Sequence, residues 1–343
     1  MQENFRLGAP RLHAIFSEYT MMPLCLHAPA KLNLFLAITG RRSDGFHSLV
    51  SLAVPLDFGD ELELRITDRE TGDTRLRVEG EASAAEVPSG PDNLVLRAAS
   101  AFREASGFAR PVEFVLKKRV PVGAGLGGGS SDAVAALRGL NTLAAKDECA
   151  LDEKTLCALA AKLGADCAFF ACGKPAIMRG RGERIEPLNE AAAKRLGGGS
   201  LFVCKPAFGV STAWAYGEMA TRAASVEGGD YYVAEAEAER LCGQWLTSGV
   251  GAEQPLESLT FNNMESVVFR KYPALPVLAA TFRERFGLIL RMSGSGSACF
   301  AFLPKETRDA AANTALVRQL SECVRELWGP SAFSRVVRVR TGA

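Results

Sequence analysis

The feature that most constrains this chain is a glycine-rich segment between a strand pattern and a helix pattern. Residues 121–132 read Pro-Val-Gly-Ala-Gly-Leu-Gly-Gly-Gly-Ser-Ser-Asp, so five of the twelve are glycine. Residues 112–116 before it predict a strand, and Val134, Leu137 and Leu140 after it form an apolar helical stripe. Glycine lets backbone N–H groups approach a ligand, and the start of a helix adds positive charge. The segment therefore predicts a phosphate-binding loop.

Three common loop classes do not match this segment. Gly123, Gly125 and Gly128 satisfy G-x-G-x-x-G, but residues 117–119 and Pro121 separate the strand from the loop. No clear strand ending in an acidic residue follows about 20 residues later, as a dinucleotide site needs. The ending Gly-Gly-Ser-Ser lacks the lysine of a P-loop and the final glycine of a hydrolase elbow. The residues therefore favour a triphosphate-binding loop of a third type. The charged run Lys117-Lys118-Arg119 before it could face phosphate, although charge runs usually face solvent.

Composition excludes several classes of partner. The net charge of +1 gives no electrostatic argument for binding nucleic acid or an anionic membrane. Apolar runs such as residues 34–38 are too short to span a bilayer. Nine cysteines without paired spacing and only three histidines predict reduced thiols in a cytoplasm and no structural zinc.

Local patterns predict an α+β protein rather than a doubly wound sheet, because strands and helices alternate irregularly. Residues 30–39 predict a buried strand that carries Lys31 and Asn33, and residues 93–105 predict a helix ended by Gly107. Asp152 is the expected cap of a helix that Gly164 ends.

The length of 343 residues is enough for about two domains of ~150 residues. We expect residues 1–23 to form a poorly ordered extension, with an upstream start codon as the alternative. An N-terminal domain over 24–196 and a C-terminal domain over 197–343 follow. Residues 219–256 are acidic and weakly patterned, which predicts a helical excursion or a surface insertion rather than core.

Four ordered motifs carry a resemblance to known proteins. Residues 121–131 closely resemble the phosphate loop of the kinase superfamily that includes galactokinase, homoserine kinase and mevalonate kinase. Residues 29–36 with 40–47, 163–166 and 293–297 are similar to signatures of the 4-diphosphocytidyl-2-C-methyl-D-erythritol kinase family. The match runs from about residue 26 to the end. It implies a two-domain α+β kinase, with an N-terminal domain like ribosomal protein S5, a C-terminal α+β sandwich and an active site between them.

The resemblance implies transfer of the γ-phosphoryl group of ATP to the C2 hydroxyl of the cytidylated methylerythritol, a step of the non-mevalonate isoprenoid pathway. Asp166 stands in an otherwise apolar stretch, where a carboxylate is costly to bury unless it is paired. Lys31 is the natural partner. Residue types alone leave a structural salt bridge as probable as a catalytic pair, and the resemblance assigns Asp166 as general base with Lys31 beside it. Another superfamily kinase and a catalytically silent binding protein are the competing hypotheses.

The resemblance also implies the ATP-binding residues. Ser130 and Ser131 would cap the helix, contact phosphate or magnesium, or do both, and Asp132 is expected to serve the first helical turn. No carboxylate pair suggests a protein-held Mg²⁺, so we assign no metal ligand and expect phosphates and water to hold the ion. The expected phosphate and ATP contacts are Pro121, Gly123, Gly125, Leu126, Gly127, Gly128, Gly129, Ser130, Ser131 and Asn93.

The cytidine and acceptor side depends on single residues carried over from the motifs. Phe46 stands where the family usually has tyrosine, and His47 has a structural role as its alternative. Tyr216 is assigned to stack on cytosine, against the alternative of helix packing. The partners expected are small molecules only, with no nucleic acid and no membrane, for a cytoplasmic monomer or weak homodimer. The expected substrate contacts are Asn33, Phe46, His47, Thr212, Tyr216, Gly294 and Ser295.

Overall fold

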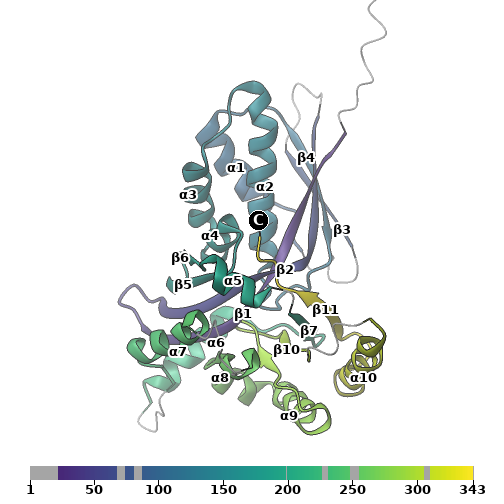
Figure 1. The fold of residues 1–343 in the computed structure, drawn as a ribbon. Helices are drawn as coiled ribbons and strands as arrows, with labels where there is room; N and C mark the ends of the chain where they lie inside the picture. Colours follow the sequence, from purple (N-terminus) through teal and green to yellow (C-terminus); the bar gives the residue numbers. More distant parts are fainter. Residues whose placement is uncertain are drawn as a thin grey trace, which may run out of the picture.

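The computed structural model describes residues 22–67, 74–80, 87–197, 199–225, 231–247, 255–304 and 310–342. The extension expected over residues 1–23 lies outside the described residues, except for the last two. Figure 1 shows two halves, one with helices against a twisted sheet and the other with a smaller sheet among helices. The α+β class predicted from the sequence is confirmed.

The larger sheet is built on a long antiparallel hairpin of β1 (Leu24–Arg41) and β2 (His47–Ile66). Its main order is β3-β4-β2-β1-β8, where β4 (Val112–Lys118) precedes the glycine loop. The remaining strands are β3 (Arg75–Gly80), β5 (Ala176–Gly180), β6 (Arg184–Pro187) and β8 (Phe261–Asn262). β5 pairs with the part of β2 that follows the hairpin turn, which brings the β5–β6 turn toward the hairpin end.

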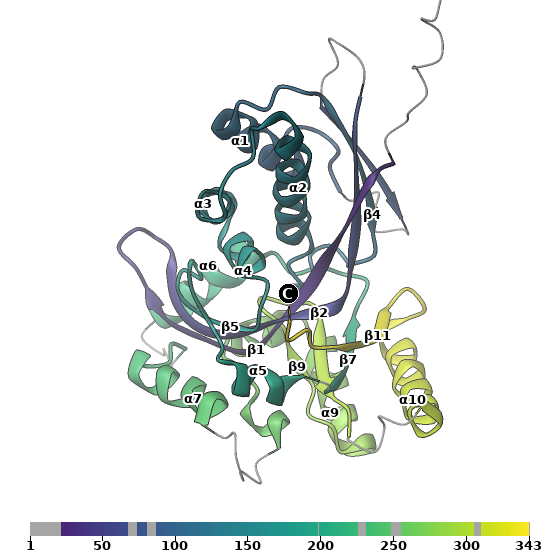
Figure 2. The same ribbon diagram turned by 45° about the horizontal axis from the view of Figure 1, so that its top comes forward.

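One face of this sheet is covered by the first four α-helices (Figures 1 and 2). They are α1 (Leu94–Ser106), α2 (Gly128–Ala144), α3 (Glu153–Leu163) and α4 (Ala165–Cys172). The predicted Asp152 cap is confirmed, since its side chain accepts from the Thr155 amide, and Gly107 closes α1 in the left-handed conformation as expected. At the start of α1, Asn93 accepts from the Val95 amide, a cap that was not predicted. The sequence reading missed α4, which begins immediately after the extended Gly164.

The second sheet has the order β11-β7-β10-β9 among its described strands. They are β7 (Ser200–Lys205), β9 (Arg291–Met292), β10 (Cys299–Phe302) and β11 (Phe333–Arg338). The helices near it are α5 (Glu190–Leu196), α6 (Thr212–Ala223), α7 (Glu235–Thr247), α8 (Glu265–Lys271), α9 (Ala274–Phe286) and α10 (Ala310–Trp328). β8 joins β1 of the larger sheet, and Arg340 donates its backbone N–H to Pro55. One hydrophobic cluster also draws on both halves, with Leu32 of β1 and Val203 of β7 among its members. The boundary at residue 197 stays a prediction.

The segment over 219–256 differs from the expectation. It is helical at α7, as proposed, but Ala238, Cys242 and Trp245 are buried, and the Trp245 indole donates to the Leu259 carbonyl at 3.1 Å. The expectation that this segment lies outside the core is wrong for its described part. Its acidic composition concealed a helix whose apolar residues share one face.

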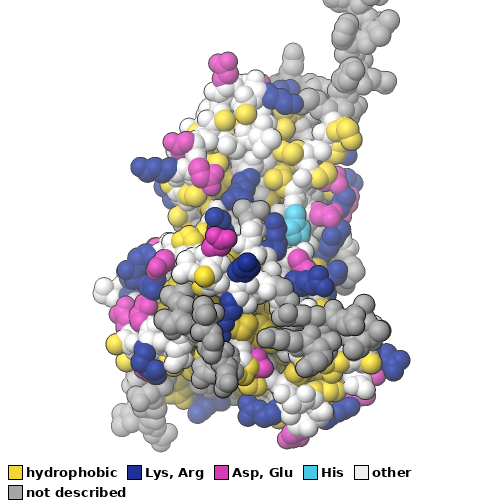
Figure 3. Space-filling model, viewed as in Figure 1, with side chains coloured by type: hydrophobic (Ala, Val, Ile, Leu, Met, Phe, Trp, Pro, Cys, Tyr) yellow, Lys and Arg dark blue, Asp and Glu magenta, His cyan; other side chains and the backbone are white. Residues whose placement is uncertain are grey.

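The described surface and thiols agree with the composition. Charged side chains of both signs are interspersed over the face in Figure 3. All nine cysteines are free, in agreement with the expected reduced thiols. Among the described helices, none combines the length and apolarity that crossing a membrane requires.

Candidate functional site

The glycine loop requires glycine where it meets the second half of the molecule. Gly123, Gly125 and Gly127 have φ values of +62°, +75° and +72°, which side chains rarely adopt. A Cβ atom on Gly125 would lie 2.3 Å from the Ser293 carbonyl oxygen, far inside contact distance. The loop is therefore shaped both by its backbone dihedrals and by the close approach of the 293–297 loop.

Backbone hydrogen bonds join three separate segments beneath this loop. Ala298 donates to the Ala124 carbonyl at 3.0 Å, and Lys31 donates to the Leu126 carbonyl at 2.9 Å. The Ser293 hydroxyl donates to the Gly125 carbonyl at 3.3 Å. These bonds fix β1, the glycine loop and the 293–297 loop relative to one another.

A pocket lies along the outer side of the glycine loop, and we call it the loop pocket. It is lined by the nine predicted ATP-side residues Asn93, Pro121, Gly123, Gly125, Leu126, Gly127, Gly128, Gly129 and Ser130. Ser131 is the exception, because it lines a different cavity with Phe170 and Arg138. The Ser131 hydroxyl is buried without a hydrogen-bond partner among the described residues, so the expected phosphate contact through this side chain does not fit.

The charge run before the loop is divided between the two interpretations, because Lys118 lines the loop pocket whereas Arg119 is exposed. Lys118 is buried and donates to the carboxylates of Asp60 and Asp132, the latter at 2.9 Å. Burial raises the pKa of Asp132 to about 8, and Lys118 offsets only part of that shift. We expected Asp132 to serve the first helical turn. Its side chain instead belongs to a buried charge cluster with Lys118 and Asp60. Lys117 and Arg119 are partly exposed and pair with acidic residues of β2.

Lys31 and Asp166 meet in a second pocket, which we call the central pocket. The Lys31 ammonium lies 3.8 Å from the Asp166 carboxylate and 2.5 Å from the Asn33 side-chain oxygen. Asn33 in turn donates to the Ser51 hydroxyl at 2.8 Å, which fixes the orientation of its amide. The predicted pair is thus present, but Asp166 is 36% exposed rather than buried, because it stands in the first turn of α4 at the pocket wall.

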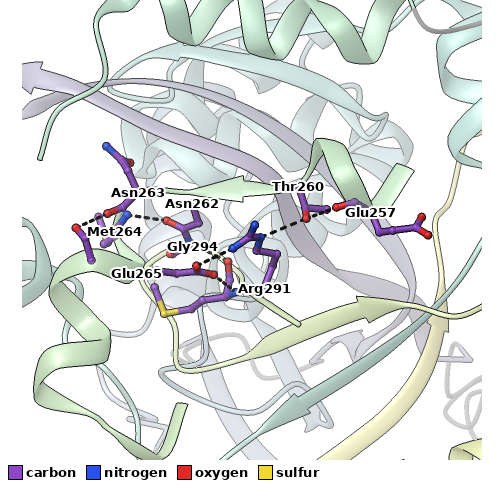
Figure 4. Close-up of polar contacts among 10 residues, drawn as sticks. Glu257, Thr260, Asn262, Asn263, Met264, Glu265, Arg291 and Gly294 are labelled. Carbon is purple, nitrogen blue, oxygen red and sulfur yellow. Dashed lines mark hydrogen bonds and ion pairs between the residues drawn. The ribbon is translucent and has the colours of Figure 1, made fainter. Parts of the chain in front are cut away.

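The 293–297 loop is held by residues that the sequence reading did not assign (Figure 4). The Asn262 amide donates to the carbonyls of Met292 and Gly294, both at 2.8 Å. The Glu265 carboxylate accepts from the Met292 amide at 2.8 Å and from Arg291 at 3.2 Å. Burial raises the pKa of Glu265, although these donors oppose the shift. In the sequence, only the Asn-Asn-Met-Glu run at 262–265 indicates that polar side chains hold this loop.

A third pocket, which we call the outer pocket, has a volume of about 910 Å³ and is lined by Phe46, His47 and Tyr216. The His47 and Tyr216 rings lie 5.0 Å apart, centre to centre, and His47 Nε2 lies 3.1 Å from the Tyr232 hydroxyl. Burial, with the nearby charge of Arg41, lowers the pKa of His47, so the ring is neutral at pH 7. Tyr232 belongs to the segment expected to be an insertion, and nothing in its sequence pattern signalled this contact.

The three pockets are continuous through residues that they share. Gly125, Ser130, Asp166 and Thr212 line both the loop pocket and the central pocket. The central and outer pockets share Arg181, Thr212 and Tyr216. The Thr212 hydroxyl lies 2.8 Å from that of Ser295, which joins α6 to the 293–297 loop. All seven predicted substrate contacts line the central or the outer pocket.

Comparisons with known proteins agree with this arrangement. Residues 93–174 match the GHMP kinases N terminal domain, and residues 248–321 match the GHMP kinases C terminal family. A 4-diphosphocytidyl-2-C-methyl-D-erythritol kinase of Methylacidiphilum infernorum is 36% identical over 285 residues, covering 81% of this chain and 86% of that relative. The crystal structure of a 4-(cytidine 5'-diphospho)-2C-methyl-D-erythritol kinase is 33% identical, with a TM-score of 0.66 over 92% of this chain and 99% of the other.

A second solved structure shows how widely the fold is shared. Homoserine kinase from Cytophaga hutchinsonii superposes with a TM-score of 0.63 at 18% identity, covering 98% of each chain. That likeness concerns the fold alone. The two matched family models, together with the glycine loop and its pocket, define a small-molecule kinase of the GHMP type.

The particular family follows from the higher identities. The chain belongs to the 4-diphosphocytidyl-2-C-methyl-D-erythritol kinase family.

Proposed function

We propose that this protein is an ATP-dependent kinase that phosphorylates the C2 hydroxyl of 4-diphosphocytidyl-2-C-methyl-D-erythritol, in the non-mevalonate isoprenoid pathway. The observation that carries this proposal is the position of Asp166, which lines both the loop pocket and the central pocket with Lys31 3.8 Å away. A nucleotide on the glycine loop and an alcohol in the central pocket would meet at this carboxylate. Family membership supplies the identity of the two substrates.

The residues suggest a division of labour in the transfer. Backbone N–H groups of the glycine loop and the start of α2 would hold the phosphates of ATP. Asp166 would accept the proton of the C2 hydroxyl as its oxygen bonds to the γ-phosphorus and the bond to ADP breaks. Lys31 would orient that hydroxyl and neutralise charge on the transferred group. Asn33 fixes the Lys31 ammonium from its other side.

The donor set around the loop fits Mg²⁺ bound mainly through the nucleotide. Among the described residues, no group of three or more histidine, cysteine or acidic side chains could form a metal cage. Mg²⁺ commonly keeps several waters and uses substrate phosphates with one or two protein oxygens. The Ser130 hydroxyl, which lines both pockets, would supply such an oxygen. The ion would neutralise charge on the β- and γ-phosphates.

The experiment that tests this function compares three acceptors under identical ATP and Mg²⁺ concentrations. We expect ATP-dependent ADP release with the cytidylated methylerythritol, and kcat/KM values at least about 100-fold lower with homoserine and mevalonate, because neither fills the outer pocket. Preference for either simpler alcohol would contradict the proposal. ATP binding without turnover of any acceptor would favour the silent binding protein.

The compartment and assembly remain part of this proposal. We propose a cytoplasmic protein, in keeping with nine free cysteines, that acts on small molecules as a monomer or weak homodimer. Size-exclusion chromatography with light scattering at micromolar concentration measures the assembly, and a stable higher oligomer would contradict it.

A further inference from the structure

The turn between β5 and β6 brings a cation to the place where two pockets join. Arg181 lies between Gly180 and Gly182, whose φ values are +70° and +100°. The Glu183 carboxylate accepts the Arg181 backbone N–H at 2.5 Å, which fixes the turn. Arg181 lines both the central pocket and the outer pocket. The sequence reading assigned no role to this residue.

The Arg181 guanidinium is held over an aromatic ring rather than by a carboxylate. Its central carbon lies 4.7 Å from the centre of the Phe46 ring. Within the described residues the Arg181 guanidinium forms no ion pair with a carboxylate, whereas that of Arg179, two residues earlier, pairs with both Glu186 and Glu239. Asp44 in the β1–β2 turn interacts with Arg181 electrostatically without forming an ion pair with it, so the guanidinium N–H donors remain available to an anionic ligand.

The position of Arg181 matches a specific part of the substrate, and this step rests on the proposed function. With the acceptor hydroxyl at Asp166 and the cytidine beside His47 and Tyr216, the linking diphosphate must pass the residues common to both pockets. Those residues are Arg181, Thr212 and Tyr216, and only Arg181 is a cation. Other cations line only one of the two: Lys31 lies in the central pocket and Arg41 in the outer pocket.

We propose that Arg181 binds the diphosphate that links cytidine to the acceptor alcohol. The guanidinium presents paired N–H donors that match phosphate oxygens, and a charge-assisted bond of this kind is stronger than one between neutral groups. The contact with Phe46 holds the side chain at the pocket entrance until the ligand arrives. Arg181 is thereby a substrate-binding residue that distinguishes a cytidine diphosphate derivative from an uncharged alcohol.

The test measures the dissociation constants of cytidine and CDP for the wild-type protein and for Arg181→Met, Arg181→Lys and Arg184→Met. Arg184 is the matched control, because it is an exposed arginine on the same hairpin that lines none of the three pockets. We expect Arg181→Met to weaken CDP about tenfold, as loss of one charge-assisted contact does, while cytidine is unchanged. Arg181→Lys should recover part of the loss, and Arg184→Met should have no effect.

Two outcomes would overturn the inference. Equal weakening of cytidine and CDP in Arg181→Met would show that Arg181 acts by packing on Phe46, and unchanged binding of both would remove it from the site. Failure of the proposed function is separable, because it would appear as absence of turnover and of CDP binding in the wild-type protein. The inference about Arg181 alone is refuted if the wild-type enzyme phosphorylates the cytidylated alcohol but Arg181→Met leaves the ratio of the CDP and cytidine dissociation constants unchanged.

Discussion

The loop pocket and the outer pocket are built in opposite ways. The loop pocket takes most of its lining from one continuous segment, 120–130, in which glycines expose the backbone. The outer pocket is formed by side chains from the end of β1, the β1–β2 turn, the β5–β6 turn and α6. A backbone site suits a phosphate chain common to many kinases, whereas a side-chain site can change from one family to the next. The central pocket, where Lys31 and Asp166 meet, joins the shared part to the variable part.

The largest effect on turnover is expected at Asp166, where the loop pocket meets the central pocket. Asp166→Asn should leave ATP binding intact and lower kcat at least about 100-fold, because a positioned base is lost without a change of shape. The measurement is steady-state turnover together with nucleotide affinity by calorimetry. Asp147→Asn, which alters a partly exposed ion pair with Arg110 outside the pockets, is the control. A kcat for Asp166→Asn within threefold of the wild type would refute its role as base.

Adding a methyl group to the glycine loop should lower ATP affinity more than it affects the acceptor substrate. Gly125→Ala would force an unfavourable positive φ and place Cβ against the Ser293 carbonyl, so we expect a lower ATP affinity and a loss of about 1–3 kcal/mol of stability. Thermal unfolding and ATP titration measure both. Gly243→Ala, where a Cβ meets nothing within 4 Å, should leave ATP affinity unchanged. Wild-type behaviour of Gly125→Ala would mean that the two loops do not need this approach.

A change confined to the outer pocket should separate the two substrates. Tyr216→Leu is expected to raise the KM for the cytidylated substrate about tenfold, through lost stacking, while the KM for ATP stays the same. Trp214→Leu, on the same helix but outside the pockets, controls for damage to α6. An equal rise in both KM values would contradict the claim that ATP and the cytidylated substrate bind in different pockets.

A last effect, which concerns stability rather than substrate binding or turnover, is a pH dependence that arises beneath the glycine loop. Because the pKa of Asp132 is raised to about 8, the folded state retains a proton that the unfolded chain releases near its ordinary value of 3.8. Stability therefore falls as pH rises between these values. Asp132→Asn removes this titration, so its melting temperature should exceed that of the wild type more at pH 8 than at pH 5. A difference that does not change with pH would contradict the shift.

The sequence was most informative where function depends on local pattern. The glycine loop and the polar residues Lys31 and Asn33 within an apolar strand follow from neighbouring residues, and the structure places them in the pockets. Lys118 could not be assigned in this way, because its partners depend on β2 pairing with β4, which brings Asp60 beside it.

The outer pocket shows the same limit. Arg181 reads as a solvent-exposed turn residue until the hairpin is placed beside Phe46, and Tyr232 lies in a segment whose composition suggested an insertion. Asn262 and Glu265 act on backbone groups about 30 residues away in the chain, at the 293–297 loop. Side-chain roles that depend on distant segments need the folded arrangement, whereas the resemblance reached only residues inside its motifs.

The most direct test of the account is a crystal structure with a non-hydrolysable ATP analogue, Mg²⁺ and the cytidylated methylerythritol bound together. The decisive measurement is the distance from the C2 hydroxyl oxygen to the nearer Asp166 carboxylate oxygen. We predict about 2.6–3.2 Å, the range of a hydrogen bond to a general base, with the γ-phosphate on the same side of the central pocket. A C2 oxygen more than about 5 Å from Asp166, with another acidic residue closer, would contradict the claim that the two pockets meet at this carboxylate.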